Sequence, residues 1–445
     1  MTRPSDRIIF VVALFVLVLL IMVRITPRPP VPDGFARYAY GVSEFGVYGP
    51  ADGSEHAPAP SMGRAPLYPW FLTLFVALDS QYREYLSCHY QHSGNCGDLP
   101  VSPRVGDLIL GLLSIIPLYF TARRLGASER TTYVSLFVLM GIWLPWTYMH
   151  GVSESIALPL HALLTYMTVR FLFDSSQRQF KLVIGIGLVL GLLALGRFAY
   201  QFYIPILMIV VFFAYRSDKR HAITRRLIAV VLLLVGFAGV TGPWYFRNYQ
   251  HFGVVSLGSS GSTGVIVARV HYNRMNPAEY AASFLYWFPF VGEKIAVRIL
   301  PEAAWARLNT DNPDGFRQRS QMYRRELGQQ GYSRTDIRRI AQAEVVKHWP
   351  KHLFVSIPFV VRGLRYAILF VPLTLVWLWH TILHRKWRSL VALSGGWFII
   401  VFHAGLTHFN VRYGWPIAFD FACVSAVGAT VVLDYWKQRR AIADR

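Results

Sequence analysis

The sequence is poor in cysteine and in charged residues, and it lacks the short motifs of several soluble enzyme classes. Only three of the 445 residues are cysteines, and only 16% are charged. Three cysteines are too few for a disulfide-stapled domain. No GxxxxGK[ST] phosphate loop, HExxH zinc helix or CxxC pair occurs, so the sequence does not point to a P-loop, zinc-protease or thiol-redox enzyme.

Long apolar runs are what the chain has instead. Hydrophobic residues make up 54% of it, in runs near the roughly 20 residues that cross a hydrocarbon core as helix. We therefore expect an all-α polytopic membrane protein with about ten transmembrane helices and both termini in the cytoplasm. The net charge of +21 lies mostly in short loops such as RSDKRHAITRR and HRKWR, which indicates cytoplasmic loops rather than a nucleic-acid partner.

The apolar runs divide the chain into five predicted parts. Residues 1–24 hold the first transmembrane helix, Ile8 to Val23, as a retained span rather than a cleaved signal peptide. The other parts are a first outer loop at 25–104, transmembrane helices 2–7 at 105–245, a second large outer loop at 246–352 and the C-terminal helices at 353–445. Within the first outer loop, Leu67 to Leu78 is apolar but short, so we expect an interfacial or re-entrant helix.

Two cysteines share the first outer loop, in SCHYQHSGNC. Outside the cytoplasm thiols are oxidised, so we predict a disulfide between Cys88 and Cys96. The alternative is a metal site, because His89 and His92 lie between the two cysteines. Cys423 is expected to be an inert residue in the last span.

Four arginines fall where a predicted span meets the outer loops. They are Arg64, Arg197, Arg247 and Arg412. A guanidinium group can hold a phosphate group through two parallel hydrogen bonds, so these residues are candidates for binding a lipid-linked phosphate. The simpler interpretation is that each one extends to the membrane interface.

Other residues near the predicted outer face carry weaker signals. Glu154 lies at the start of a span, where a carboxylate can cap a helix N-terminus or contact a substrate. Tyr38 and Tyr68 suit an interfacial aromatic belt or contacts with a sugar or acceptor. The run LGSSGSTG at 257–264 is either a flexible linker or a backbone cradle for phosphate.

The order of these motifs resembles the GT-C superfamily of polytopic glycosyltransferases, in particular the protein O-mannosyltransferases and the aminoarabinose lipid A transferases. Five pieces carry the resemblance over most of the chain: PDGFARYAYGVSEFG after the first span, RAPLYPWFL, LPWTYMHGVSES, GPWYFRNYQHFG and a late NVRYGWP. Each piece is short, and their common order makes the match specific.

The resemblance implies a reaction on the outer face of a bacterial inner membrane. A sugar on a polyprenyl phosphate would be transferred, with inversion, to a hydroxyl group on an acceptor glycan, lipid or protein. The family's first-loop acid, matched here by Asp33, would act as general base, with Glu44 and Asp52 as the other candidates. The sequence shows no metal cluster, so we expect no essential metal ion, and a divalent cation stays an open alternative.

Two other functions fit the same composition. A carrier or flippase for polyprenyl-linked glycans would also have many spans and basic residues at the membrane rim. Carriers are often built from internal repeats around midplane binding residues, whereas no repeat is visible here. The third function is that of a non-catalytic member of a glycan assembly complex. Neither the donor sugar nor the acceptor can be named from the sequence.

Overall fold

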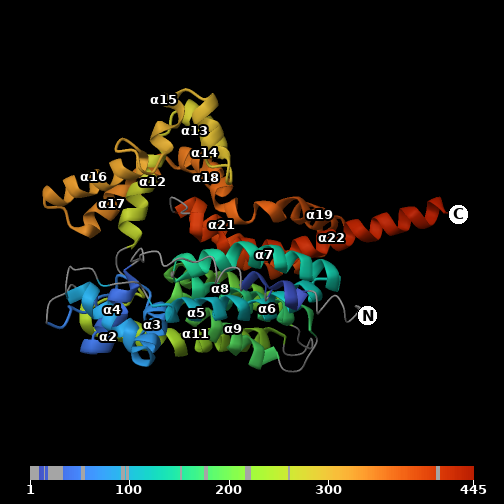
Figure 1. Ribbon diagram of the computed structural model, residues 1–445, viewed down its shortest axis with the longest axis horizontal. Helices are drawn as coiled ribbons and strands as arrows, with labels where there is room; N and C mark the ends of the chain where they lie inside the picture. Colours follow the sequence, from blue (N-terminus) through green and yellow to red (C-terminus); the bar gives the residue numbers. More distant parts are fainter. Residues whose placement is uncertain are drawn as a thin grey trace. The chain divides into compact units, whose positions relative to one another are not determined.

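The computed structural model describes residues 10–14, 16–18, 34–51, 56–91, 96, 100–150, 153–174, 179–215, 222–258, 261–406 and 411–444. Throughout these ranges the chain forms helices and loops without a strand, as the all-α prediction requires. It folds into two units (Figure 1). Unit 1 comprises Met1–Gly258, Phe370–Gly395 and Phe419–Arg445, and unit 2 comprises Ser259–Leu369 and Gly396–Ala418.

Within the residues that the structure describes, five helical segments are long and apolar enough to cross a membrane, which supports a polytopic membrane protein. They are Ser102–Arg124, Glu154–Phe173, Gln179–Gly196, Ala222–Phe252 and Val411–Ala443. A sixth is formed if Trp349–Tyr366 and Ile368–Leu383, which meet at an 89° bend, make one broken span. The count of about ten spans and the five-part division stay predictions, and half of the first predicted span, Ile8 to Val23, lies outside the described residues.

Unit 1 is a helical bundle with a group of shorter helices. Its elements are α2 (Phe35–Phe45), α3 (Leu67–Leu78), α4 (Ser80–Gln91), α5 (Ser102–Leu113), α6 (Ile115–Arg124), α7 (Glu129–His150), α8 (Glu154–Phe173), α9 (Gln179–Gly196), η1 (Phe198–Tyr203), α10 (Ile204–Ala214), α11 (Ala222–Phe252), α19 (Val371–Leu383), α20 (Trp387–Ala392) and most of α22 (Trp415–Ala443). Figure 1 shows α8, α9 and α11 side by side.

Glycines allow α9 and α11 to approach closely. A Cβ atom at Gly187 would lie 2.3 Å from the Leu233 carbonyl oxygen, and one at Gly236 would lie 2.5 Å from the Ile184 carbonyl oxygen. No larger residue fits at either position without moving a helix. Such small-residue contacts are how helices associate in membranes, where burial of apolar surface provides no driving force between them.

The short helices α2, α3 and α4 pack together around aromatic side chains. Helix α3 has the bounds predicted from the sequence, Leu67–Leu78. Tyr40, Tyr82 and Tyr85 form a buried cluster with Leu86 and Val76. This packing gives the first predicted outer loop a folded core.

Unit 2 contains the rest of the chain. Its elements are α12 (Gly261–Tyr272), α13 (Pro277–Tyr286), α14 (Gly292–Ile299), α15 (Glu302–Trp305), η3 (Ala306–Leu308), α16 (Phe316–Gln329), α17 (Arg334–Lys347), α18 (Trp349–Gly363), η4 (Leu364–Tyr366), most of η5 (Ile368–Phe370) and of α21 (Ser394–Leu406), and η6 (Val411–Gly414). In Figure 1, α16 and α17 lie beside α12. Two of these helices, α13 and α17, have capping boxes at their N-termini, formed by Asn276 with Glu279 and by Ser333 with Asp336.

Candidate functional site

The chain just after Asp33 lies against Arg64. Gly34 has a φ of +73° and precedes α2, and a Cβ atom added there would lie 3.6 Å from Arg64 Nη2. The Arg64 guanidinium also lies over the Phe35 ring, 5.0 Å from its centroid. Asp33 itself is outside the described residues.

A buried carboxylate, that of Asp107, is connected to Phe35 through Tyr68. Phe35 contacts Tyr68 edge to face, with ring centroids 5.5 Å apart. The Tyr68 hydroxyl donates a hydrogen bond to Asp107 Oδ2 at 3.0 Å, and both residues are 1% exposed. A buried carboxylate requires such donors because its charge has lost its water. Tyr68 thus has a definite partner, and Asp107 joins the candidate site.

Glu154 and Arg197 form a second buried pair. Glu154 lies in the first turn of α8 and is 1% exposed. Its Oε1 is 3.9 Å from Nη2 of Arg197, which is 8% exposed and connects α9 to η1 in extended conformation. Opposite charges buried together stabilise each other, and losing either partner leaves an uncompensated charge. The structure therefore brings two of the predicted site residues together.

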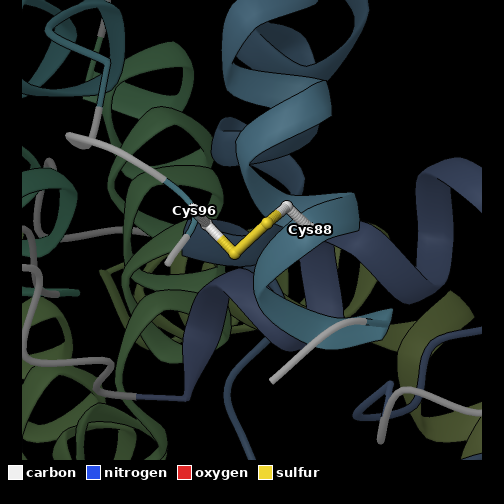
Figure 2. The surroundings of a disulfide bond; sticks show 2 residues. All are labelled: Cys88 and Cys96. Carbon is white, nitrogen blue, oxygen red and sulfur yellow. A yellow bond between two sulfur atoms is a disulfide. The ribbon is translucent and has the colours of Figure 1, made fainter. Parts of the chain in front are cut away.

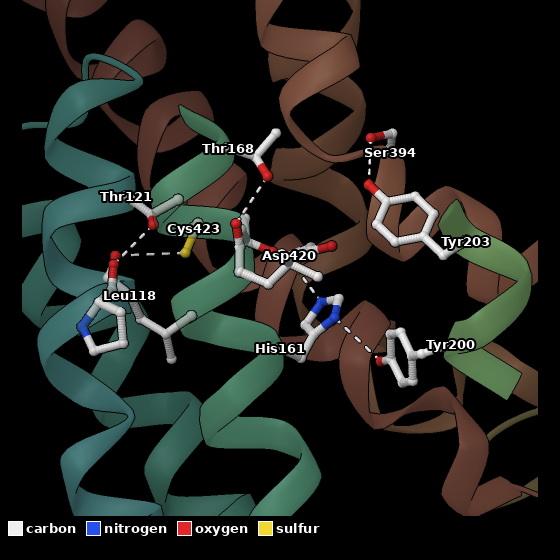
Figure 3. A network of polar contacts seen from close by, with 12 residues as sticks. Leu118, Thr121, His161, Thr168, Tyr200, Tyr203, Ser394, Asp420 and Cys423 are labelled. Carbon is white, nitrogen blue, oxygen red and sulfur yellow. Dashed lines mark hydrogen bonds and ion pairs between the residues drawn. The ribbon is translucent and has the colours of Figure 1, made fainter. Parts of the chain in front are cut away.

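A third polar network lies deeper in the bundle. Figure 3 shows His161 of α8 between Asp420 of α22 and Tyr200 of η1. His161 Nε2 is 3.3 Å from Asp420 Oδ1, which also accepts a hydrogen bond from Thr165 at 3.1 Å. The Tyr200 hydroxyl is 3.1 Å from His161 Nδ1. Since the Tyr200 amide donates to the Arg197 carbonyl at 3.0 Å, this network holds the turn that carries Arg197.

Arg247 has its donors engaged by the first loop. Its Nη1 donates to the Ser61 carbonyl and its Nη2 to the Tyr48 carbonyl, both at 3.0 Å. Its guanidinium lies over the Trp244 ring at 4.6 Å. Burial raises the pKa of Tyr48 well above its ordinary value, so the hydroxyl that donates to the Arg64 carbonyl keeps its proton. These contacts give Arg247 a structural task, that of holding this loop.

The remaining predicted residues lie in different places. Tyr38 is buried, with its hydroxyl 3.1 Å from Ser61 Oγ. Glu44 forms an ion pair with the exposed Arg83 at 2.9 Å. Arg412 belongs to unit 2 and lies 5.7 Å from the Tyr413 ring centroid. Asp52 lies outside the described residues.

The two cysteines of the first loop are joined. A disulfide bond connects Cys88, near the end of α4, to Cys96 (Figure 2). A bridged pair offers no thiolate to a metal ion, so this geometry favours the disulfide over the metal alternative. Cys423 is free and buried in α22.

Metal-binding side chains do not gather elsewhere in the part of the chain that the structure describes, where no group of three or more His, Cys, Asp and Glu side chains is placed to hold an ion. Asp33 and Asp52 lie outside this part of the chain.

With this geometry described, comparison with solved structures shows which fold it is. The structure matches archaeal oligosaccharyltransferase AglB from Archaeoglobus fulgidus, solved with an inhibitory peptide and a dolichol-phosphate, with a TM-score of 0.53 at 14% identity over 99% of this chain and 52% of that one. The chain shares the fold of the matched half of the oligosaccharyltransferase. The oligosaccharyltransferase solved with zinc and sulfate matches with a TM-score of 0.52 at 17% identity over 98% of this chain and 50% of that one.

The oligosaccharyltransferase likeness supports the GT-C fold that the sequence motifs resemble. It does not extend to the narrower similarity to O-mannosyltransferases and aminoarabinose transferases. At 14–17% identity it establishes the fold alone, and the chain spans about half the length of the oligosaccharyltransferases it matches. No protein-family model and no curated protein matches the sequence.

Sequence reasoning missed Asp107, His161 and Asp420. Each lies in an apolar helix that passes the length and hydropathy criteria for a span. Ionisable residues within such helices are rare and usually functional. The sequence shows these ionisable residues in the stretches SPRVGDLILG, LPLHALL and IAFDFAC, but it does not show which side chains they contact.

Proposed function

We propose that the protein is a glycosyltransferase that uses a polyprenyl-phosphate-linked sugar. The observation that carries this proposal is the fold. Over 98–99% of its length, the chain matches an oligosaccharyltransferase, and one of the matched structures was solved with a dolichol-phosphate. A lipid-linked donor also suits the apolar helices of unit 1, which would hold a polyprenyl chain in the bilayer. The proposed location is a bacterial inner membrane, with the site facing the periplasm.

The reaction we propose is a single displacement at the anomeric carbon. An acceptor hydroxyl oxygen forms the new bond to that carbon while the bond to the phosphate oxygen breaks, which inverts the configuration. The proton of the hydroxyl passes to the Asp33 carboxylate, which acts as general base. The bonding electrons leave with the polyprenyl phosphate.

Two arginines of the candidate site would stabilise the leaving group. Charge develops on the phosphate oxygens as the bond breaks, and cations already in place lower the barrier. Arg64 lies beside the chain at Gly34, and Arg197 is held by Glu154. We assign the phosphate to these two, and we assign Arg247 and the Tyr68–Asp107 pair to positioning the loop and α3.

The test is complementation of a strain that lacks the gene, followed by mass spectrometry of its surface glycans. The deletion should remove one sugar from a surface glycan, and the wild-type gene should restore it. Asp33→Asn preserves size and removes the base, so it should fail to restore the sugar at wild-type protein levels. Glu44→Gln alters an exposed ion pair and is the matched control, which should restore it.

Full restoration by Asp33→Asn would show that Asp33 is not the base. A deletion strain with unchanged glycans would contradict the transferase itself.

A carrier for polyprenyl-linked glycans is the second candidate. The observation that favours it is the His161–Asp420 pair, which lies within candidate spans, because ionisable residues inside spans often form the ion sites of carriers. The same experiment separates the two functions. Loss of a carrier would remove a whole glycan rather than one sugar, and Asp33→Asn would then restore it.

A further inference from the structure

A cavity in unit 2 is unrelated to the residues described so far. It has a volume of about 330 Å³ and opens to the surface. Its walls come from the turn between α13 and α14, from the segment after η3 and from the end of α18 and η4. This volume is near the lower end of the range for small-molecule sites, so the cavity suits a ligand of one or two sugar rings.

The backbone is strained beside this cavity. Phe290 has a φ of +65°, and the Val291 amide donates to the Pro289 carbonyl at 2.8 Å across it. This is a γ-turn in its rare, strained form. The Phe290 ring is 52% exposed, so burial of the ring does not explain why a bulky residue occupies a position that favours glycine. Strain that packing does not explain is typical of ligand sites.

Guanidinium groups are fixed beside the aromatic rings of the cavity. Arg362 lies over the Trp287 ring at 5.1 Å, and Arg365 lies over the Phe290 ring at 5.7 Å. Trp287 also stacks on Phe359, with centroids 4.8 Å apart, which immobilises it. Arg365 thus presents hydrogen-bond donors to the cavity at little further entropic cost.

Carboxylates line the same cavity. Glu293 accepts a hydrogen bond from Tyr286 at 3.0 Å, and Asp311 is also a lining residue. Carboxylates beside guanidinium groups disfavour both a simple anion and a simple cation. They suit a ligand whose hydroxyl groups both donate and accept, and the exposed Phe290 ring suits an apolar C–H face.

We propose that this cavity binds a saccharide, with Phe290 as the stacking platform and Arg365 as a donor to its hydroxyl groups. Its role as the subsite for the acceptor glycan rests on the proposed function, whereas saccharide binding itself does not. The geometry therefore allows binding and transfer to be tested separately.

The experiment is saturation-transfer-difference NMR on the full-length protein in nanodiscs. The probes are methyl glycosides of glucose, galactose, mannose and arabinose and the glucuronic acid glycoside, at millimolar concentration. At least one should give signals from its ring protons. Arg365→Ala should weaken that binding about tenfold, the effect of losing one charge-assisted hydrogen bond. Arg338→Ala, an exposed arginine on α17, is the matched control and should bind as wild type.

Phe290→Gly distinguishes a ligand site from ordinary packing. Glycine adopts positive φ without strain, so this variant should unfold at the same temperature as wild type or higher, while glycoside binding is lost. A lower melting temperature with unchanged binding would overturn the proposal, as would the absence of any glycoside signal. Binding in a protein that fails the glycan complementation test would retain this site and refute the transferase, and transfer without binding would do the reverse.

Discussion

Replacing Tyr200 with phenylalanine removes one hydroxyl group from a buried network and keeps the ring. In the wild type this hydroxyl is 3.1 Å from Nδ1 of His161, whose other nitrogen is 3.3 Å from Asp420. All three residues are at most 1% exposed. Tyr200→Phe therefore leaves the ring nitrogen of a buried histidine without this partner.

The expected loss of stability follows from that orphaned nitrogen. Leaving a buried polar group unsatisfied costs about 1–3 kcal/mol. In domains of 150–250 residues this lowers the melting temperature by about 2–4 °C per kcal/mol, so a fall of a few degrees is expected. Activity should fall more, about tenfold. Without its contact to His161, residue 200 can shift, and its amide, which donates to the Arg197 carbonyl at 3.0 Å, would then move Arg197 with it. Small shifts of a positioned group are costly in rate.

Tyr203→Phe is the matched control on the same turn. Its hydroxyl is 2.5 Å from Ser394 Oγ, whereas the Tyr200 hydroxyl is 3.1 Å from His161 Nδ1. Melting curves in detergent and transfer kinetics in membranes should show a loss of kcat for Tyr200→Phe, and for Tyr203→Phe only a small loss of stability. Equal kinetics for both variants would refute the idea that the network positions Arg197.

The remaining predictions concern charge, topology and pH. Glu154→Gln leaves the buried Arg197 cation with a neutral partner, so we expect a loss of both stability and kcat. In a double-mutant cycle, adding Arg197→Lys to Glu154→Gln should cause little further loss. Ala59→Cys and Gln330→Cys place exposed thiols in the two predicted outer loops, and both should react with an impermeant maleimide in intact cells; labelling of only one would contradict the predicted topology, and the wild type should stay unlabelled because its cysteines are bridged or buried. Burial, and to a smaller extent nearby arginines, lowers the pKa of His271 from 6.5 to about 4. Between these pH values the unfolded state binds more protons than the folded state, so unit 2 should lose stability as the pH falls from 6.5 towards 4. Limited proteolysis should show a weaker pH dependence for His271→Gln than for the wild type.

The membrane class and several helices could be predicted from the sequence because their causes are local. A run of apolar residues reports its own length, and Leu67–Leu78 forms a helix with the predicted bounds. The cysteines at 88 and 96 are eight residues apart, so their proximity was also a local property. The resemblance to GT-C proteins used short motifs in order, and the fold agrees with it.

The partners of the site residues were decided only by the tertiary structure. His161 and Asp420 meet across 259 positions of the chain, and Arg247 reaches carbonyl groups 186 and 199 positions away. A sequence shows that an arginine can bind phosphate, but its donors can equally be used by backbone carbonyls that the fold brings near. Helix formation depends on neighbours along the chain, whereas hydrogen-bond partners, burial and the strained turn at Phe290 depend on how distant segments pack.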